Sequence, residues 1–364
     1  MNLQDEIRVK TKEFRKDSYP MSIGEIINLY KSKEIFIAPE FQRYFRWSTA
    51  QKSRFIESIL LGIPTPSIFV YQREDGIWEL VDGLQRISTI LEFMGILEDE
   101  NGDIKPPLEL EGTKILPRLK GVKWEGSENE DCNLPRAVKL DFKRSKIQVE
   151  IIQKESDINA KFEVFERLNT GGSFLSYQEV RNCLLTMISR DVYQWLSELA
   201  NNENFQNCIS ISDRLLKERY DMELALRYIA CSHFELRTRD VNEYLTDSLM
   251  EICKDANFQL EDEKVKFNKL FRLLNKATGE GSFKKYDGQR FKGKFLESAY
   301  EAITIGIGAN IDDYSEQDSD IESLEKKVQQ IWLNTDFTEN SGSGSNARTR
   351  IPQMIQFGKQ HFKK

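Results

Sequence analysis

Asp82, Gly83, Gln85 and Arg86 carry the functional groups needed for phosphate chemistry and lie within one short segment. They stand where a strand-like run ends and an apolar-periodic helix begins. A helix N-terminus offers unpaired backbone N–H groups and a partial positive charge, and Arg86 adds a guanidinium that can hold two phosphate oxygens. Gly83 allows a tight turn, and the Asp82 carboxylate is available to a metal ion, a ribose or an attacking water. The segment therefore predicts a site for a phosphate-bearing ligand.

A purely structural interpretation of this segment stays open. Asp-Gly is a common turn dipeptide, and Ser88 and Thr89 could bind a ligand or only satisfy the start of the helix. One glycine is also weaker evidence than a complete phosphate-loop fingerprint. A second Asp-Gly-Gln-Arg run, at 287–290, follows no predicted strand, and we expect it to be a chance resemblance in an exposed loop.

A second cluster follows a strand-like run and alternates aromatic with polar residues, ending at Trp47. Its two guanidinium groups could complement phosphate charge beside Arg86, and its carboxylate could hold a metal ion. Alternatively, the aromatic rings pack in the core and the arginines form surface ion pairs. The candidate residues of this cluster are Glu40, Gln42, Arg43 and Arg46.

A third cluster is a helix that ends in a glycine-rich turn. Asn169 and Gly171 form a plausible ligand loop there, although the glycines could also do no more than end the helix. Glu163 and Glu166 lie on one face of the preceding helix and, with Glu40, are candidates for a second metal-binding carboxylate.

The charge balance gives no global attraction to nucleic acid, because 52 Lys and Arg stand against 59 Asp and Glu, a formal net charge of −7. Any DNA contact must therefore rest on a local basic patch, and the sequence offers two. Either could also be an ordinary solvated surface. The first holds Arg136, Lys139, Lys143, Arg144 and Lys146, and the second holds Arg348, Arg350, Lys359, Lys363 and Lys364.

The two histidines and five cysteines exclude several kinds of site. His233 lies in an apolar-periodic run and His361 in a basic tail, so HNH nuclease, Ser-His-Asp and HExxH chemistry are disfavoured. The cysteines are scattered singly, which argues against disulfides and structural zinc. With no apolar run of about 20 residues and no secretion-signal pattern, we expect a cytoplasmic protein without membrane contact.

The periodicity predicts an α+β protein of two domains: a mixed α/β domain at 1–155 and an all-helical domain at 156–364. A helix opens at Ser48 and ends at Gly62. The predicted strands are 34–38, 67–71, 78–81 and 146–152, and the predicted helices of the second domain are 160–168, 177–199, 212–234, 241–254, 263–274, 292–305 and 321–333.

The three clusters together, with the run Ser-Ile-Leu-Leu-Gly-Ile-Pro at 58–64, resemble a known family. The motifs are Glu-Phe-Gln-Arg from Glu40, Val-Asp-Gly-Leu-Gln-Arg-Ile-Ser-Thr from Val81, and Phe-Glu-Arg-Leu-Asn-Thr-Gly-Gly from Phe165. In their order and spacing they are similar to the N-terminal domain family of GmrSD-type modification-dependent restriction endonucleases.

This resemblance implies a ParB/sulfiredoxin-like fold in which an Asp-Gly-x-Gln-Arg motif serves nucleotide binding and hydrolysis. Asp82, Gly83, Gln85 and Arg86 would be that motif, and Gln42 and Arg43 would stand on the opposite wall of the pocket. Leu84 replaces a glutamine common in relatives, and we expect it to point into the domain. The resemblance further implies an NTP (GTP or ATP) and Mg²⁺.

The hypothesis is therefore a nucleotide-binding, NTP-hydrolysing component of a bacterial DNA restriction or anti-phage system. Asp82, Gln85 and Arg86 would be catalytic, Asp82 and Glu40 would hold the metal, and the remaining nucleotide contacts would come from Gln42, Arg43, Arg46, Gly83, Ser88, Asn169 and Gly171. Because the helical half shows no HNH-like histidine motif, DNA cleavage would need a separate nuclease; a methyltransferase subunit and self-association are further partner hypotheses. The alternatives are a non-enzymatic DNA-binding or sensor module and a ParB-like nuclease.

Overall fold

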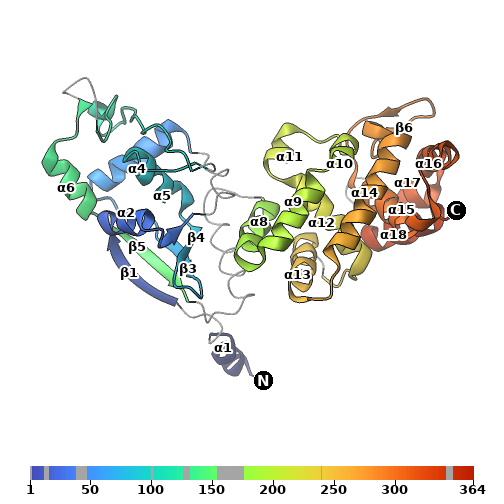
Figure 1. Cartoon of the computed structure of the whole chain (residues 1–364), viewed down its shortest axis with the longest axis horizontal. Helices are drawn as coiled ribbons and strands as arrows, with labels where there is room; N and C mark the ends of the chain where they lie inside the picture. Colours follow the sequence, from blue (N-terminus) through green and yellow to red (C-terminus); the bar gives the residue numbers. More distant parts are fainter. Residues whose placement is uncertain are drawn as a thin grey trace. The chain divides into compact units, whose positions relative to one another are not determined.

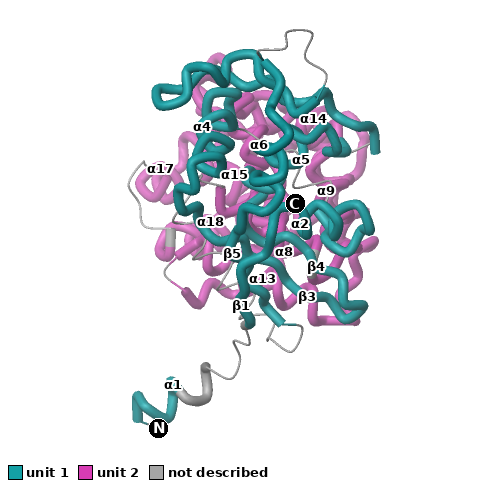
Figure 2. Tube along the Cα trace, turned by 90° about the vertical axis from the view of Figure 1, so that its left-hand side faces the viewer, with its two compact units in different colours: residues 1–174 teal, residues 175–364 magenta. Residues whose placement is uncertain are grey.

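The computed structural model describes residues 2–11, 16–37, 47–99, 102–125, 132–153, 176–238, 240–341 and 347–364. The chain forms two compact units, unit 1 at Met1–Phe174 and unit 2 at Leu175–Lys364 (Figure 2). Unit 1 is mixed α/β and unit 2 is almost entirely helical (Figure 1), so the predicted fold class is confirmed. The predicted domain boundary at 155/156 lies outside the described residues.

Unit 1 is built on a five-stranded mixed sheet with the strand order β1-β5-β3-β4-β2. Strand β5 pairs antiparallel with β1 and parallel with β3, whereas β4 pairs antiparallel with β3 and parallel with β2. The strands are β1 (Lys16–Ser22), β2 (Ile35–Phe36), β3 (Ile68–Gln72), β4 (Trp78–Asp82) and β5 (Lys146–Ile152).

Strand β1 is the one strand of this sheet that the sequence pattern did not predict. It is mostly polar and contains Pro20, which has no N–H to donate to a sheet ladder. The structure places β1 at the edge of the sheet, paired with β5 alone among the described strands. A proline is tolerated in an edge strand. The proline that made β1 difficult to recognise in the sequence therefore fits its position at the edge of the sheet.

Helix α4 of unit 1 begins and ends at caps that are visible in the sequence. Ser48 accepts the N–H of Gln51 in a capping box at the start of α4, and Gly62 follows its end with a φ of 69°, both as predicted. The helices are α1 (Leu3–Thr11), α2 (Ile23–Lys31), α4 (Thr49–Leu60), α5 (Leu84–Phe93) and α6 (Arg136–Arg144), with a 3₁₀ turn at Pro117–Leu119.

The core of unit 1 joins α5 to α6 through aromatic rings. Trp124 packs against Phe93 of α5 and Phe142 of α6, with ring centroids 5.7 and 5.5 Å apart. All three side chains are buried. Leu84 packs against the same core, as expected for a side chain that points into the domain.

Unit 2 is a bundle of helices around a single large core. The predicted helices at 177–199 and 212–234 are each two helices in the structure. Ser189 caps a new helix in the first, and Arg219 takes a left-handed φ of 59° in the second. The helices are α8 (Tyr177–Ile188), α9 (Arg190–Ala200), α10 (Glu203–Cys208), α11 (Asp213–Lys217), α12 (Tyr220–His233), α13 (Val241–Lys254), α14 (Leu260–Ala277), α15 (Glu297–Ala309), α16 (Asp318–Gln330), α17 (Thr335–Asn340) and α18 (Ala347–His361), with 3₁₀ turns at Gly279–Gly281, Ile311–Asp313 and Ile331–Leu333.

A small hairpin interrupts the helices of unit 2. Its strands are β6 (Lys285–Tyr286) and β7 (Phe291–Lys292), paired antiparallel. The hairpin carries the Asp-Gly-Gln-Arg run at 287–290, so the expectation that this run follows no strand is wrong. The strands are only two residues long, which is too short for a period-two pattern to appear in the sequence.

Within the described part of the chain, no helix combines the length and the apolar character needed to cross a membrane.

Candidate functional site

The predicted phosphate site lies at the turn from β4 to α5. Gly83 is the N-cap of α5 and has a φ of 102°, a left-handed backbone conformation that residues other than glycine rarely adopt. A Cβ atom at this position would lie 3.1 Å from Ile68 Cγ1 and 3.3 Å from Arg86 Nη2. Because Gly83 has no side chain, it cannot cap the first N–H groups of α5. These N–H donors therefore lie at the end of strand β4, and the side chains of Ile68 and Arg86 pack closely against Gly83.

Asp82 and Arg86 form an ion pair across the first turn of α5. Arg86 Nη2 lies 2.7 Å from Asp82 Oδ2 and also donates to the carbonyl oxygen of Ser67 at 2.9 Å. These contacts fix the guanidinium at the end of the strand. Arg86 Nε is buried and has no hydrogen-bond partner among the described residues. An unpaired buried donor costs about 1–3 kcal/mol, so such a group calls for an explanation such as a ligand or an ion.

Gln85 connects the turn to the start of α4. Its Oε1 accepts a hydrogen bond from the backbone N–H of Trp47 at 3.1 Å. Trp47 directly follows the second predicted cluster in the sequence. The cluster itself, with Glu40, Gln42, Arg43 and Arg46, lies outside the described residues, as do Glu163, Glu166, Asn169 and Gly171.

Ser88 lies deeper in unit 1 than the other predicted residues. Its side chain belongs to a residue that is 1% exposed, and its Oγ has no hydrogen-bond partner among the described residues. Thr89 is also buried and donates to the carbonyl oxygen of Gln85 at 2.6 Å. The hydroxyl of Thr89 is therefore used inside the helix, on a carbonyl oxygen four residues back, and does not satisfy an N–H group of the helix start.

Asp82 is the one carboxylate that the described residues place at the turn, and its side chain is 31% exposed. Nowhere in the described ranges do three or more His, Cys, Asp or Glu side chains gather as a metal site. Mg²⁺ is commonly bound by one or two carboxylates together with substrate phosphates and water. A single partly exposed carboxylate beside a phosphate site fits that chemistry.

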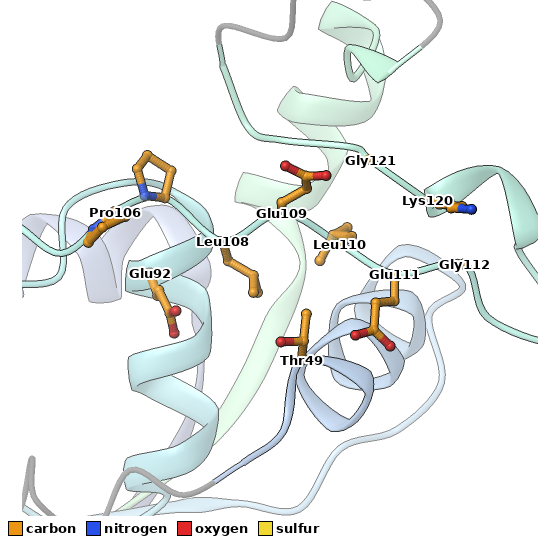
Figure 3. Close-up of a pocket in the computed structure, with 11 residues that line it drawn as sticks. Thr49, Glu92, Pro106, Leu108, Glu109, Leu110, Glu111, Gly112, Lys120 and Gly121 are labelled. Carbon is orange, nitrogen blue, oxygen red and sulfur yellow. The ribbon is translucent and has the colours of Figure 1, made fainter.

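A groove of about 710 Å³ lies on the same unit, beside the end of α5 (Figure 3). Thr49 of α4 and Glu92 of α5 contribute to its wall, together with the segment from Pro106 to Gly112. Glu92 is already paired with Lys52 at 2.7 Å. The groove is lined by residues of α4 and α5 but by none of the residues from Asp82 to Arg86. It is therefore separate from the β4–α5 turn.

The first predicted basic patch lies on α6. Arg136, Lys143 and Arg144 are exposed and form no ion pair with a described carboxylate, while Lys139 lies 3.9 Å from exposed Glu125. The ammonium groups of Lys139 and Lys143 lie 5.5 and 5.8 Å from the centre of the Trp124 ring. The contribution of Trp124 was not predicted, because its distance in sequence from α6 gives no signal of this contact.

Two of the five cations of the second predicted basic patch, Arg350 and Lys364, form ion pairs within unit 2. Arg350 of α18 binds Glu301 at 2.8 Å and Glu297 at 3.2 Å, and Glu301 is fully buried. Lys364 pairs with Asp320 at 2.6 Å. The hypothesis of a free cationic tail is therefore wrong for Arg350 and Lys364, because α18 packs against α15 and brings these cations to acidic partners.

Arg350 is part of a larger buried charge network. Arg227 of α12 binds Glu223, Glu297 and Glu301 at 2.9 to 3.1 Å. Burial alone would raise the pKa of Glu297, but Arg227, the hydroxyl of Tyr220 and Arg350 lower this pKa below its usual value. The network holds α12, α15 and α18 together through matched charges and shows the character of a structural cluster.

The histidines and cysteines take structural positions, as predicted. His233 pairs with Glu263 at 2.9 Å, and His361 Nε2 lies 2.8 Å from the carbonyl oxygen of Lys327. All five cysteines are free. Burial raises the pKa values of Cys208 and Cys231 to about 12, which makes both thiols poor nucleophiles.

Comparison with known proteins gives one positive finding. Residues 23–186 match the family model of the GmrSD restriction endonuclease, N-terminal domain, while no curated protein and no solved structure matches the chain. The matched region includes the whole β4–α5 turn and extends into α8. The match indicates a component of a DNA restriction or defence system. Residues 23–186 of this chain are therefore similar to the N-terminal domain of the GmrSD restriction endonuclease family.

Proposed function

We propose that this protein is the nucleotide-binding, NTP-hydrolysing component of a DNA restriction or defence system, and that the β4–α5 turn binds the triphosphate. The observation that carries the proposal is the buried Nε of Arg86, which has no partner among the described residues, beside the uncapped start of α5. A charged donor at a helix start, where the partial positive charge of the helix lies, forms an environment that suits an anion.

Each element of the turn has a defined task in this proposal. The N–H groups at the start of α5 and the guanidinium of Arg86 bind phosphate oxygens, while Ser67 and Asp82 hold that guanidinium in place. Gln85 keeps Trp47 and the start of α4 close to the turn. By the family resemblance, Gln42 and Arg43 are assigned to the other wall of the nucleotide pocket. The turn therefore acts as a fixed anion site before the ligand arrives.

Asp82 has the additional task of binding Mg²⁺ or orienting the attacking water. Mg²⁺, when bound, neutralises charge that builds up on the phosphate oxygens during transfer. Phosphoryl transfer depends mainly on positioning and electrostatic stabilisation, so a site of Arg, Asp and Gln without histidine is sufficient for it.

The proposal is tested with the purified full-length chain, radiolabelled ATP and GTP, and Mg²⁺. Equilibrium binding and turnover are measured for the wild type, Arg86→Ala and Asp82→Ala. Loss of the guanidinium removes a charge-assisted contact worth about 1.5–3 kcal/mol, which corresponds to a fall of at least about tenfold in affinity. Asp82→Ala should reduce turnover more than binding, because the carboxylate acts on the metal or the water.

Arg290→Ala is the matched control, since Arg290 follows the second Asp-Gly-Gln sequence on the exposed hairpin of unit 2. It should bind and turn over nucleotide like the wild type. Equal affinity and turnover in the wild type, Arg86→Ala and Asp82→Ala would remove both the nucleotide site and the enzymatic assignment.

A further inference from the structure

The segment at 136–146, which contains α6, is one of several short stretches of the chain with a concentration of positive charge; 284–294 is another, also with five cations and one carboxylate. Residues 136–146 hold five cations and one carboxylate, Asp141, whereas the whole protein has a net charge of −7. The cations that face outward on the helix are Arg136, Lys139, Lys143 and Arg144, and they are called here the α6 basic face.

The fold sets which side of α6 these cations occupy. Phe142 is 1% exposed and packs in the core, which directs one side of the helix inward. At 3.6 residues per turn, Arg136, Leu140 and Arg144 recur on the side away from Phe142, and Leu140 there is 42% exposed. Lys139 and Lys143 lie on the neighbouring flank above Trp124. The face is therefore a continuous outer surface of the helix.

Trp124 orders two of the cations before any partner binds. The two ammonium groups lie within 6 Å of its ring centre, at 5.5 Å for Lys139 and 5.8 Å for Lys143, and the ring itself is buried. Such cation–π contacts hold the lysine side chains over the ring while their charged ends remain available. This reduces the entropy that the side chains lose when they meet an anion.

The charges of the α6 basic face also have few carboxylate partners among the residues that the structure describes. Arg136, Lys143 and Arg144 make no ion pair with a described carboxylate, and Lys139 has only Glu125 at 3.9 Å. By contrast, Arg350 and Lys364 in unit 2 have close carboxylate partners. The two predicted basic patches therefore differ in part: two of the five cations of the second are paired with carboxylates, whereas Arg136, Lys143 and Arg144 of the first have no described carboxylate partner.

We infer that the α6 basic face binds the phosphate backbone of double-stranded DNA, without reading its bases. From Arg136 to Arg144 the helix rises about 12 Å, which spans about three to four base-pair steps of a duplex. Arg and Lys are the side chains that contact phosphates in such complexes, and these contacts position a protein on DNA irrespective of sequence. The choice of double-stranded DNA as the partner rests on the proposed role in restriction. The argument from the charges of α6 does not depend on that role.

The test is a fluorescence anisotropy titration of the full-length chain against a labelled DNA duplex of mixed sequence over a salt series. Four phosphate contacts predict that the logarithm of the association constant falls with the logarithm of salt concentration with a slope of about −3.6. The triple variant Arg136→Gln, Lys143→Gln, Arg144→Gln should bind at least about tenfold more weakly at low salt, with a slope of about −1.

A matched control removes three exposed cations from unit 2. Lys285→Gln, Arg290→Gln, Lys294→Gln changes the net charge by the same amount and should leave affinity and slope unchanged. Should the first triple variant melt early, the single changes Arg136→Gln and Arg144→Gln replace it, and each should reduce the slope by about one unit.

Three results would overturn the inference: no duplex binding by the wild type, equal losses in both triple variants, or tighter binding to an RNA duplex or to phosphatidylglycerol vesicles than to DNA. The nucleotide proposal is tested independently. Arg86→Ala should lose nucleotide binding and keep the DNA slope, whereas the α6 triple variant should lose DNA binding and keep nucleotide binding.

Discussion

The chain contains the same residue types at two turns, and they make different structures. At 82–86 the aspartate ends a buried strand, the glycine caps a helix, and the arginine folds back to pair with the aspartate at 2.7 Å. At 287–290 the aspartate accepts backbone N–H groups from Gln289 and Arg290 at 2.9 Å each, closing a hairpin between β6 and β7. Both glycines are left-handed, with φ of 102° and 98°.

This difference shows that the motif letters alone do not make an anion site. Our proposal assigns the backbone donors at the start of α5 to the phosphate, because Gly83 has no side chain to cap them, whereas the N–H groups of Gln289 and Arg290 already donate to Asp287. The two glycines also differ in how closely other atoms surround them: Gly83 is crowded and Gly288 is open. A Cβ at Gly83 would meet Ile68 and Arg86, while a Cβ at Gly288 would meet nothing within 4 Å.

The largest expected difference between the turns is in stability. Gly83→Ala combines left-handed strain with contacts at 3.1 and 3.3 Å, and it should destabilise unit 1 by about 3 kcal/mol and abolish nucleotide binding. Gly288→Ala has strain alone and should cost about 1–2 kcal/mol in unit 2. Calorimetric melting of both variants measures these costs, and equal losses would remove the distinction.

The next difference concerns the shape of the arginine side chain. Arg86→Lys keeps the positive charge but loses the fork that reaches Ser67, Asp82 and a phosphate together, so nucleotide affinity should fall about tenfold. Arg290→Lys should have no effect on affinity. Equilibrium dialysis with labelled nucleotide measures both, and full affinity in Arg86→Lys would show that charge alone is enough.

A smaller effect is expected at the glutamines. Gln85→Leu removes the acceptor for the Trp47 N–H and should weaken nucleotide binding by about threefold to tenfold, with a melting temperature close to that of the wild type. Gln85→Glu retains an acceptor oxygen and should restore most of the affinity. Gln289→Leu on the hairpin is the control. A drop in melting temperature without a change in affinity would indicate a merely structural role for Gln85.

The smallest effect is on acid stability. The N–H of Arg290, the Lys292 ammonium and the N–H of Gln289 hold the pKa of Asp287 below its usual value. A lowered pKa stabilises the fold above the unfolded value of about 3.9 and loses this effect as pH falls through the folded pKa. Asp287→Asn should therefore show a flatter decline in melting temperature below about pH 4. If the melting temperature of Asp287→Asn declined in acid as steeply as that of the wild type, the lowered pKa of Asp287 would not contribute to acid stability.

The sequence predicted the position of the site better than its internal contacts. The strand ending at Asp82 and the helix starting after Gly83 follow from local periodicity and turn chemistry, both of which are visible in the sequence. The contact of Arg86 with the Ser67 carbonyl is not visible, since it depends on how β3 and β4 align. The same holds for Gln85 and Trp47, which are 38 residues apart.

The fold class was predicted, and the errors have physical causes. Tertiary packing breaks the run at 212–234, where Arg219 adopts a left-handed φ in a sequence with no glycine or proline to mark it. The C-terminal basic segment contains helix α18, and tertiary packing brings Arg350 of this helix into an ion pair with buried Glu301. Patterns of local residues carry no information on such distant charge partners.

The most direct test of the central claim is hydrogen exchange of the full-length chain with and without a saturating nonhydrolysable triphosphate and Mg²⁺. We expect slower exchange of the backbone N–H groups at 84–86, because phosphate oxygens would accept from them, and no change at 288–291. Unchanged exchange at 84–86 under saturating nucleotide would contradict the account.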